Sequence, residues 1–95
     1  PLIGMQDGEI VALGTTRSRL RAYRRMVDLM QEKVGEGALI KVAFTHVAAR
    51  EQLETLQGMV TERFDCLETI TTELSPALAV HSGPGTVGVS FFPSS

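Results

Sequence analysis

The residues best suited to chemistry lie near the end of the chain, in the stretch HSGPG at 81–85. His81 is one of only two histidines in the sequence, and Gly83 and Gly85 bracket a proline directly after it. Glycines let the backbone approach a ligand closely, and the N–H groups of Gly85 and Thr86 could form a small anion-binding nest. A histidine beside them could donate to a carboxylate near neutral pH. An equally supported alternative is a capping His81 above a turn that the glycines merely shape.

Arginines form the second candidate group. Five of them fall within nine residues, with no acidic residue between them: Arg17, Arg19, Arg21, Arg24 and Arg25. They begin a predicted helix, where positive charge opposes the helix dipole at a cost of about 0.3–1 kcal/mol each. Guanidinium groups at a helix N-terminus can bind a carboxylate or phosphate. The residues alone favour another interpretation over an anion site. In it, the arginines form a solvated basic face that pairs with Asp28, Glu32 or another domain.

Other reactive residues are sparse. His46 ends a predicted strand, and a structural role is favoured for it over one in a binding crevice. Two histidines and the single Cys66 make a metal site improbable. The chain has neither a GxSxG nucleophile motif nor a phosphate-binding loop.

Composition further narrows the class of protein to which the chain can belong. The 95 residues suffice for one domain, and 43% of them are hydrophobic. The net charge of −2 argues against nucleic-acid binding, and no stretch is apolar over the roughly 18 residues of a membrane helix. One cysteine is typical of a cytoplasmic setting. Because the chain opens on an apolar run without a leader, we expect a piece of a longer protein, cut at a domain boundary.

Two helices and several strands must position these residues. We predict strands at 2–5 and 9–14 around an Asp-Gly turn, a helix at 15–37, a strand at 38–46, a helix at 48–63, a strand at 66–74, a short helix at 76–82 and a strand at 86–92. This order, β-β-α-β-α-β-(α)-β, predicts an α/β (α+β) fold: a mixed β-sheet with two main helices and one short helix. It also suits a ferredoxin-like regulatory or interaction module that binds a small molecule or a partner protein.

Apolar residues recur at helical spacing in both main helices. The first predicted stripe comprises Leu20, Tyr23, Val27, Met30 and Val34, ended by Gly35. The second comprises Ala49, Leu53, Leu56 and Val60, continued by Phe64.

Three segments together resemble the C-terminal half of DegV-family proteins. They are PLIGMQDGEIVALGTTRSR, FTHVAA and LSPALAVHSGPGTVGVSFFP, in the family's order and at about its separation. The closing motif is the most specific, although Ser75 stands where the family often has glycine. The resemblance implies that residues 1–95 form the C-terminal domain of the DegV fold and that an N-terminal domain is missing.

The same resemblance implies a function. It is that of a fatty-acid-binding protein of two domains, with a long acyl chain held in a tunnel between or beside them. Such a carrier presents the acyl carboxylate to a separate fatty acid kinase for bacterial phospholipid synthesis. It is cytoplasmic, uses no cofactor or metal and is not itself an enzyme.

The resemblance also assigns residues. Near the head group it places His81, Gly83 and Gly85, and it places Arg17 near the head group or the docked kinase. Arg19 and Arg21 are weaker candidates for contact with the kinase. Because the other lip of the pocket would lie in the missing domain, we expect this fragment to expose an apolar face and to associate with itself.

Overall fold

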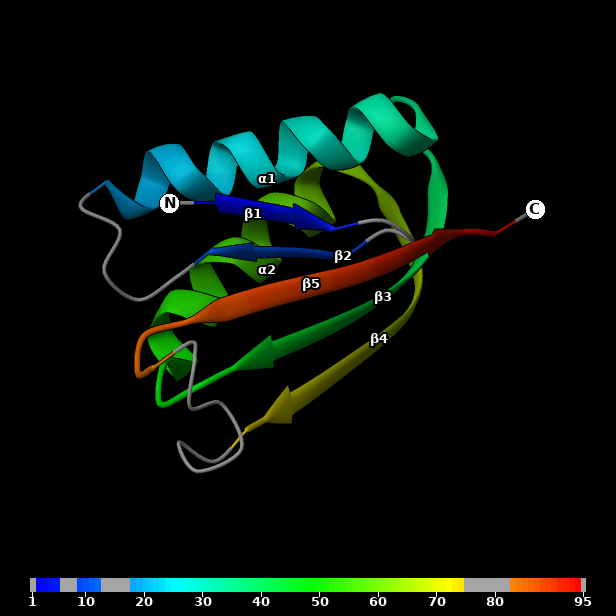
Figure 1. Cartoon of the computed structure of the whole chain (residues 1–95). Coiled ribbons are helices and arrows are strands. Elements are labelled where there is room, and N and C mark those ends of the chain that lie inside the picture. The colour runs from blue at the N-terminus through cyan, green and yellow to red at the C-terminus, as the bar shows by residue number, and fades with distance from the viewer. Residues whose placement is uncertain (1, 6–8, 13–17, 75–82, 95) are drawn as a thin grey trace.

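The computed structural model describes residues 2–5, 9–12, 18–74 and 83–94. Within these ranges the elements are β1 (Leu2–Met5), β2 (Glu9–Ala12), α1 (Arg19–Val34), β3 (Leu39–His46), α2 (Arg50–Arg63), β4 (Asp65–Glu73) and β5 (Val87–Pro93). They form one five-stranded sheet in the order β1-β2-β5-β3-β4, with two helices (Figure 1). The predicted mixed sheet with two main helices is confirmed. The short helix predicted at 76–82 lies outside the described residues.

The sheet is antiparallel from β1 through β2 and β5 to β3. Only β4 runs parallel to its neighbour, β3, among the described strands. A parallel pair needs a crossover connection, and α2 supplies it. Pairing of β2 with β5 places strands from the N-terminal and C-terminal parts of the described chain side by side.

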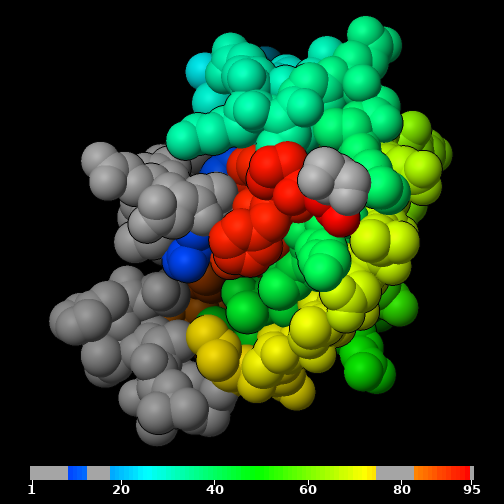
Figure 2. Space-filling model, turned by 90° about the vertical axis from the view of Figure 1, so that its right-hand side faces the viewer, coloured from blue at the N-terminus to red at the C-terminus, as the bar shows by residue number. Residues whose placement is uncertain are grey.

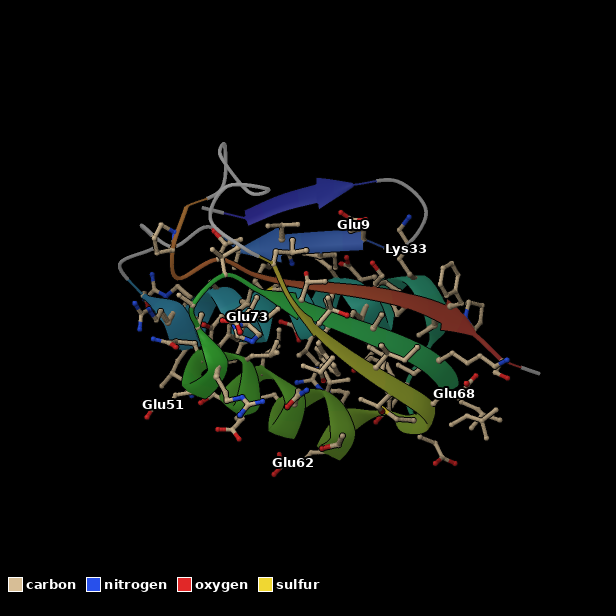
Figure 3. All side chains as sticks on the ribbon, turned by 90° about the horizontal axis from the view of Figure 1, so that it is seen from below. Glu9, Lys33, Glu51, Glu62, Glu68 and Glu73 are labelled. Carbon is tan, nitrogen blue, oxygen red and sulfur yellow. The ribbon has the colours of Figure 1, made fainter. Side chains whose placement is uncertain are left out.

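Both helices cover the same side of the sheet, as Figure 3 shows from below. Alternate residues of each strand point to that side, so Ile40, Val42 and Phe44 of β3 are buried against the helices. On β5, the residues buried against the helices are Val87, Val89 and Phe91. We call this side the helix face and the opposite side the open face.

Helix α1 begins at Arg19 and ends where the sequence indicates. Gly35 has φ 95°, and its N–H donates to the Gln31 carbonyl at 2.8 Å. Ser18 occupies the N-cap position without a side-chain capping bond. The predicted start at 15–17 lies outside the described residues.

The predicted stripe of α1 is only partly right. Tyr23, Val27 and Met30 are buried, but Leu20 is 53% exposed. The buried side of α1 is centred on Met26, and six residues of helix place Leu20 about 120° away from it. On α2, by contrast, the predicted burial of Leu53, Leu56, Val60 and Phe64 is confirmed.

Candidate functional site

The turn before β5 contains the predicted glycines. Gly83 has φ 75° and Gly85 has φ 87°, a region of backbone conformation that L side chains rarely adopt. Positive φ at both positions agrees with a turn that the glycines shape, and their approach to a ligand stays a prediction. His81, two residues earlier, lies outside the described residues.

Hydrogen bonds tie this turn to the end of β3. The Gly85 N–H donates to the Val47 carbonyl at 2.7 Å, and the Val47 N–H donates to the Thr86 carbonyl at 2.9 Å. The Thr86 hydroxyl also donates to the Gly83 carbonyl at 2.8 Å. The expectation that the Gly85 N–H is available to an anion is wrong, because Val47 uses it. The turn is therefore hydrogen-bonded to the end of β3 and is not a nest built on Gly85.

His46 has a structural role, as the sequence favoured. Its ring is 4% exposed, and its Nδ1 accepts a hydrogen bond of 3.0 Å from the Ala49 N–H. Ala49 is the N-cap residue of α2, and Ala48 before it has φ 49°. Because Nδ1 is an acceptor, the neutral ring carries its proton on Nε2. His46 thus joins the end of β3 to the start of α2.

The described arginines of the cluster are exposed on α1: Arg19, Arg21, Arg24 and Arg25. None of them forms an ion pair within the described ranges. The expected pairing with Asp28 is wrong, because the Asp28 carboxylate accepts from Arg63 of α2 at 2.8 Å. Arg17 lies outside the described residues. The exposed part of the cluster remains available to an anionic group from outside the domain.

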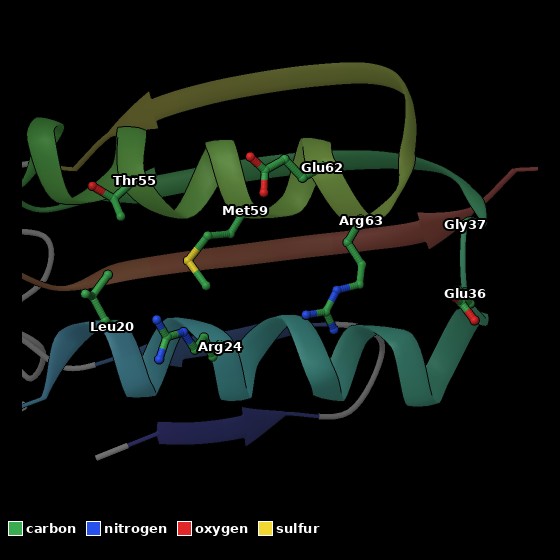
Figure 4. Close-up of a pocket in the computed structure, with 8 residues that line it drawn as sticks. All are labelled: Leu20, Arg24, Glu36, Gly37, Thr55, Met59, Glu62 and Arg63. Atoms are coloured by element: carbon green, nitrogen blue, oxygen red, sulfur yellow. The ribbon is translucent and has the colours of Figure 1, made fainter.

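A groove of about 680 Å³ runs between the two helices. Figure 4 shows Leu20 and Arg24 of α1 pointing toward Met59 and Arg63 of α2. Charged side chains also line the groove at Glu36 and at Glu62, so a long apolar ligand would leave several charges desolvated.

The open face carries a smaller trough, lined mainly by apolar atoms. Its volume is about 200 Å³, and it lies between Phe92 of β5 and Ile70 of β4, with Ala43 of β3 between them. Phe92 and Ile70 are each 58% exposed. Figure 2 shows the C-terminal end of β5 at the surface beside β3 and β4. These residues were not among the sequence-based candidates, although the adjacent Phe91 and Phe92 were an available signal, because successive strand residues point to opposite faces of a sheet.

Small residues continue the trough along the sheet. Ser90 lies opposite Ala43, and Gly88 lies opposite Thr45. A Cβ on Gly88 would approach the Thr45 Oγ1 to 2.9 Å, so the side chain of Thr45 occupies the space that glycine leaves. Gly88, Ser90 and Ala43 thus form a strip of small residues on the open face, which runs from the 83–86 turn to Phe92.

Lys41 and Glu68 border the far end of the trough. Their side chains form an ion pair at 3.4 Å, and both are more than half exposed. An exposed pair of this kind contributes about 0–1 kcal/mol. It leaves the apolar trough without an unpaired charge at that border.

This architecture, a mixed sheet with both described helices on the same side, is shared with known proteins. The family described as "Uncharacterised protein, DegV family" matches residues 1–94, and the chain belongs to the DegV family. A DegV domain-containing protein of Halalkalibacterium halodurans is 24% identical over 97% of this chain and 32% of its own length. The chain thus spans about a third of the length of that relative.

Solved structures show the same fold. A DegV lipid binding protein from Thermotoga maritima superposes with a TM-score of 0.76 at 19% identity, over 96% of this chain and 36% of its own. A DegV family protein of Corynebacterium glutamicum has a TM-score of 0.73 at 30% identity, over 84% of this chain and 30% of its own. A further Thermotoga maritima structure, described as revealing fatty acid binding function, has a TM-score of 0.76 at 20% identity. Neither described helix is long and apolar enough to cross a bilayer.

Proposed function

We propose that this chain is the C-terminal domain of a two-domain fatty-acid carrier and that its open face forms one wall of the acyl site. The observation that carries the proposal is the trough between Phe92 and Ile70, an apolar path on a sheet face that no described element covers. Two structural relatives are described as lipid binding and fatty acid binding. The carrier is cytoplasmic and catalyses no reaction itself.

The size of the trough supports a site completed by a second surface. Enclosed ligand pockets hold about 300–1,000 Å³, whereas the trough has about 200 Å³. The relative from Halalkalibacterium halodurans has about two thirds of its length outside the matched region. An additional domain of that size would supply the opposite wall of the acyl site and exclude water from the bound acyl chain.

The direction of the ligand follows from the strand register. The 83–86 turn adjoins the Gly88–Thr45 end of the open face, and Phe92 opposite Lys41 marks the other end. Four residues of strand separate the two ends by about 13 Å. The carboxylate would lie near the turn and the methylene chain would follow the small residues toward Phe92. Each buried methylene contributes about 0.8 kcal/mol before ordering costs.

The polar groups of the head region come from both predicted clusters. In this proposal His81 donates to the carboxylate, and Gly83 and Gly85 shape the turn that holds it in place. Arg17 provides positive charge near the head group. Arg19 and Arg21, on the exposed side of α1, contact a fatty acid kinase that phosphorylates the carboxylate.

The test is native mass spectrometry of the full-length protein that contains this domain, expressed in bacteria. We expect the wild-type protein to retain fatty acid. Ala43→Phe fills the trough without entering the helix-face core, and should lower acyl affinity at least about tenfold, or about 1.4 kcal/mol. Ala43→Ser, the matched control, keeps the trough open and should bind as the wild type does. A wild-type protein without lipid, or an Ala43→Phe variant with unchanged affinity, would contradict the proposal.

A further inference from the structure

Among the described strands, β4 is a long strand at the edge of the sheet, with β3 as its neighbour. It spans nine residues, Asp65–Glu73, and stands last in the order of the described strands. All its residues are exposed except the half-buried Cys66. Proteins usually protect such edges with proline, lysine or a bulge, because unpaired backbone groups attract another strand. The stretch DCLETITTE contains neither proline nor lysine.

The bulge of β4 leaves most of the edge regular. The register with β3 shifts between Ile40 and Lys41, which skips Leu67. From Glu68 to Glu73 the pairing proceeds one residue at a time. Six consecutive residues therefore present an edge that no bulge interrupts.

Hydrogen bonding to β3 decides which backbone groups of that edge point outward. The Leu74 N–H donates to the His46 carbonyl at 2.8 Å. In a parallel ladder alternate residues bond to the same neighbour, so Thr72, Ile70 and Glu68 also direct their backbone groups to β3. The N–H and C=O groups of Thr69, Thr71 and Glu73 consequently point away from the sheet.

Side chains on β4 are divided between the two faces. Thr71 lies on the helix face, where its Oγ1 accepts a hydrogen bond of 2.8 Å from Gln57 of α2. Ile70 lies on the open face beside Ala43 and is 58% exposed. This large β-branched side chain has no cover from the described elements.

We infer that β4 is the interface at which two copies of this chain pair edge to edge in antiparallel orientation, with Ile70 of each copy at the two-fold axis. The two sheets then form one continuous sheet, and the two open faces lie on the same side of it.

The charges on β4 select this register. Centring the pair on Ile70 sets Thr69 opposite Thr71 as a hydrogen-bonded pair and Glu68 opposite Thr72, so no two acidic residues meet. Shifting the axis to Thr69 would place Asp65 opposite Glu73, and like charges in direct opposition destabilise a sheet. Shifting it to Thr71 shortens the paired stretch and separates the two Ile70 side chains. Only the Ile70-centred pairing joins outward-pointing backbone groups while covering the exposed isoleucines.

Sedimentation equilibrium of the 95-residue chain over a concentration series tests the inference. We expect a dimer of the 10.3 kDa chain. Thr69→Pro removes one outward N–H and no bond to β3, so it should give a monomer with unchanged circular dichroism. Thr69→Ala is the matched control, since it changes the same side chain but keeps the N–H, and it should remain dimeric. A monomeric wild-type chain, or a folded Thr69→Pro variant that still dimerises, would overturn the inference.

Disulfide formation provides a second measurement that does not depend on the proline variant folding. In a Cys66→Ser background, Ile70→Cys should form a covalent dimer under mild oxidation, because the two positions face each other across the axis. Thr72→Cys, on the same face but away from the axis, should not. Equal cross-linking at both positions, or none at residue 70, would count against edge pairing. Dimerisation abolished by Phe92→Asp but not by Thr69→Pro would place the contact on the open face instead.

Discussion

The helix face and the open face belong to the same five strands, yet their side chains differ sharply in exposure. On the helix face Phe44 is 0% exposed and packs among the residues of α1 and α2, whereas on the open face Phe92 is 58% exposed. Both phenylalanines lie on central strands of the sheet, β3 and β5. Their difference arises because both helices pack on one side.

The comparison separates residues that hold the fold together from residues available for contact. Burial of apolar surface stabilises a fold by about 25 cal/mol per Å². The helix face therefore contributes nearly all of the stabilisation that this small domain gains from apolar burial. Exposed apolar side chains on the open face gain nothing until a ligand, another domain or a second copy covers them.

The largest expected effect comes from matched truncations on the two faces. Phe44→Ala should lower the free energy of unfolding by about 3–5 kcal/mol, because it leaves a cavity in the core. Phe92→Ala should change it by no more than about 0.5 kcal/mol, as an exposed substitution does. Chemical denaturation at a chain concentration low enough to dissociate the proposed dimer measures both. A large loss of stability for Phe92→Ala would mean that the open face is covered in solution. It would contradict the proposed difference between the two faces.

A smaller effect is expected at the end of β3, where His46 is buried on the helix face. His46→Ala should cost about 1–3 kcal/mol, because the Ala49 N–H then lacks its acceptor. His46→Asn places an oxygen close to the position of Nδ1 and should restore part of the loss. Thermal or chemical unfolding distinguishes the two variants. Equal stability of His46→Ala and the wild type would show that the bond does not support α2.

The smallest effect concerns Tyr23 of α1, which is buried in the core. Burial raises the pKa of its hydroxyl above the ordinary 10.0, and Arg19 offsets part of this rise. The unfolded chain therefore ionises first, and stability is present below pH 10 and declines as pH rises through the folded pKa. Tyr23→Phe should remove this component, so that its stability declines less above pH 10 than that of the wild type. Parallel declines in both proteins would rule out Tyr23 as the cause.

Much of the fold could be predicted from local patterns. The strand at 38–46, the stripe of α2 and the end of α1 at Gly35 each depend on neighbouring residues, and the structure confirms them. The stripe of α1 failed at Leu20 because periodicity identifies an apolar side but not the centre of the contact. The availability of the Gly85 N–H could not be predicted either, since its acceptor, Val47, is 38 residues earlier in the chain.

The family motifs were likewise visible in the residue order, at the start, middle and end of the chain. The roles of His81, Arg17, Arg19 and Arg21 remain predictions. The open-face trough was not foreseen, because its walls come from β3, β4 and β5, which are distant in sequence.

The sequence by itself determined the elements and their order, because helical spacing, strand alternation and glycine at positive φ are local properties of the chain. The tertiary structure alone decided that both helices lie on one side, that Phe92 and Ile70 meet across Ala43, and that β4 is an edge. These outcomes depend on which strands pair and in which register, and that choice is made by long-range burial and backbone hydrogen bonding rather than by any residue's neighbours in sequence.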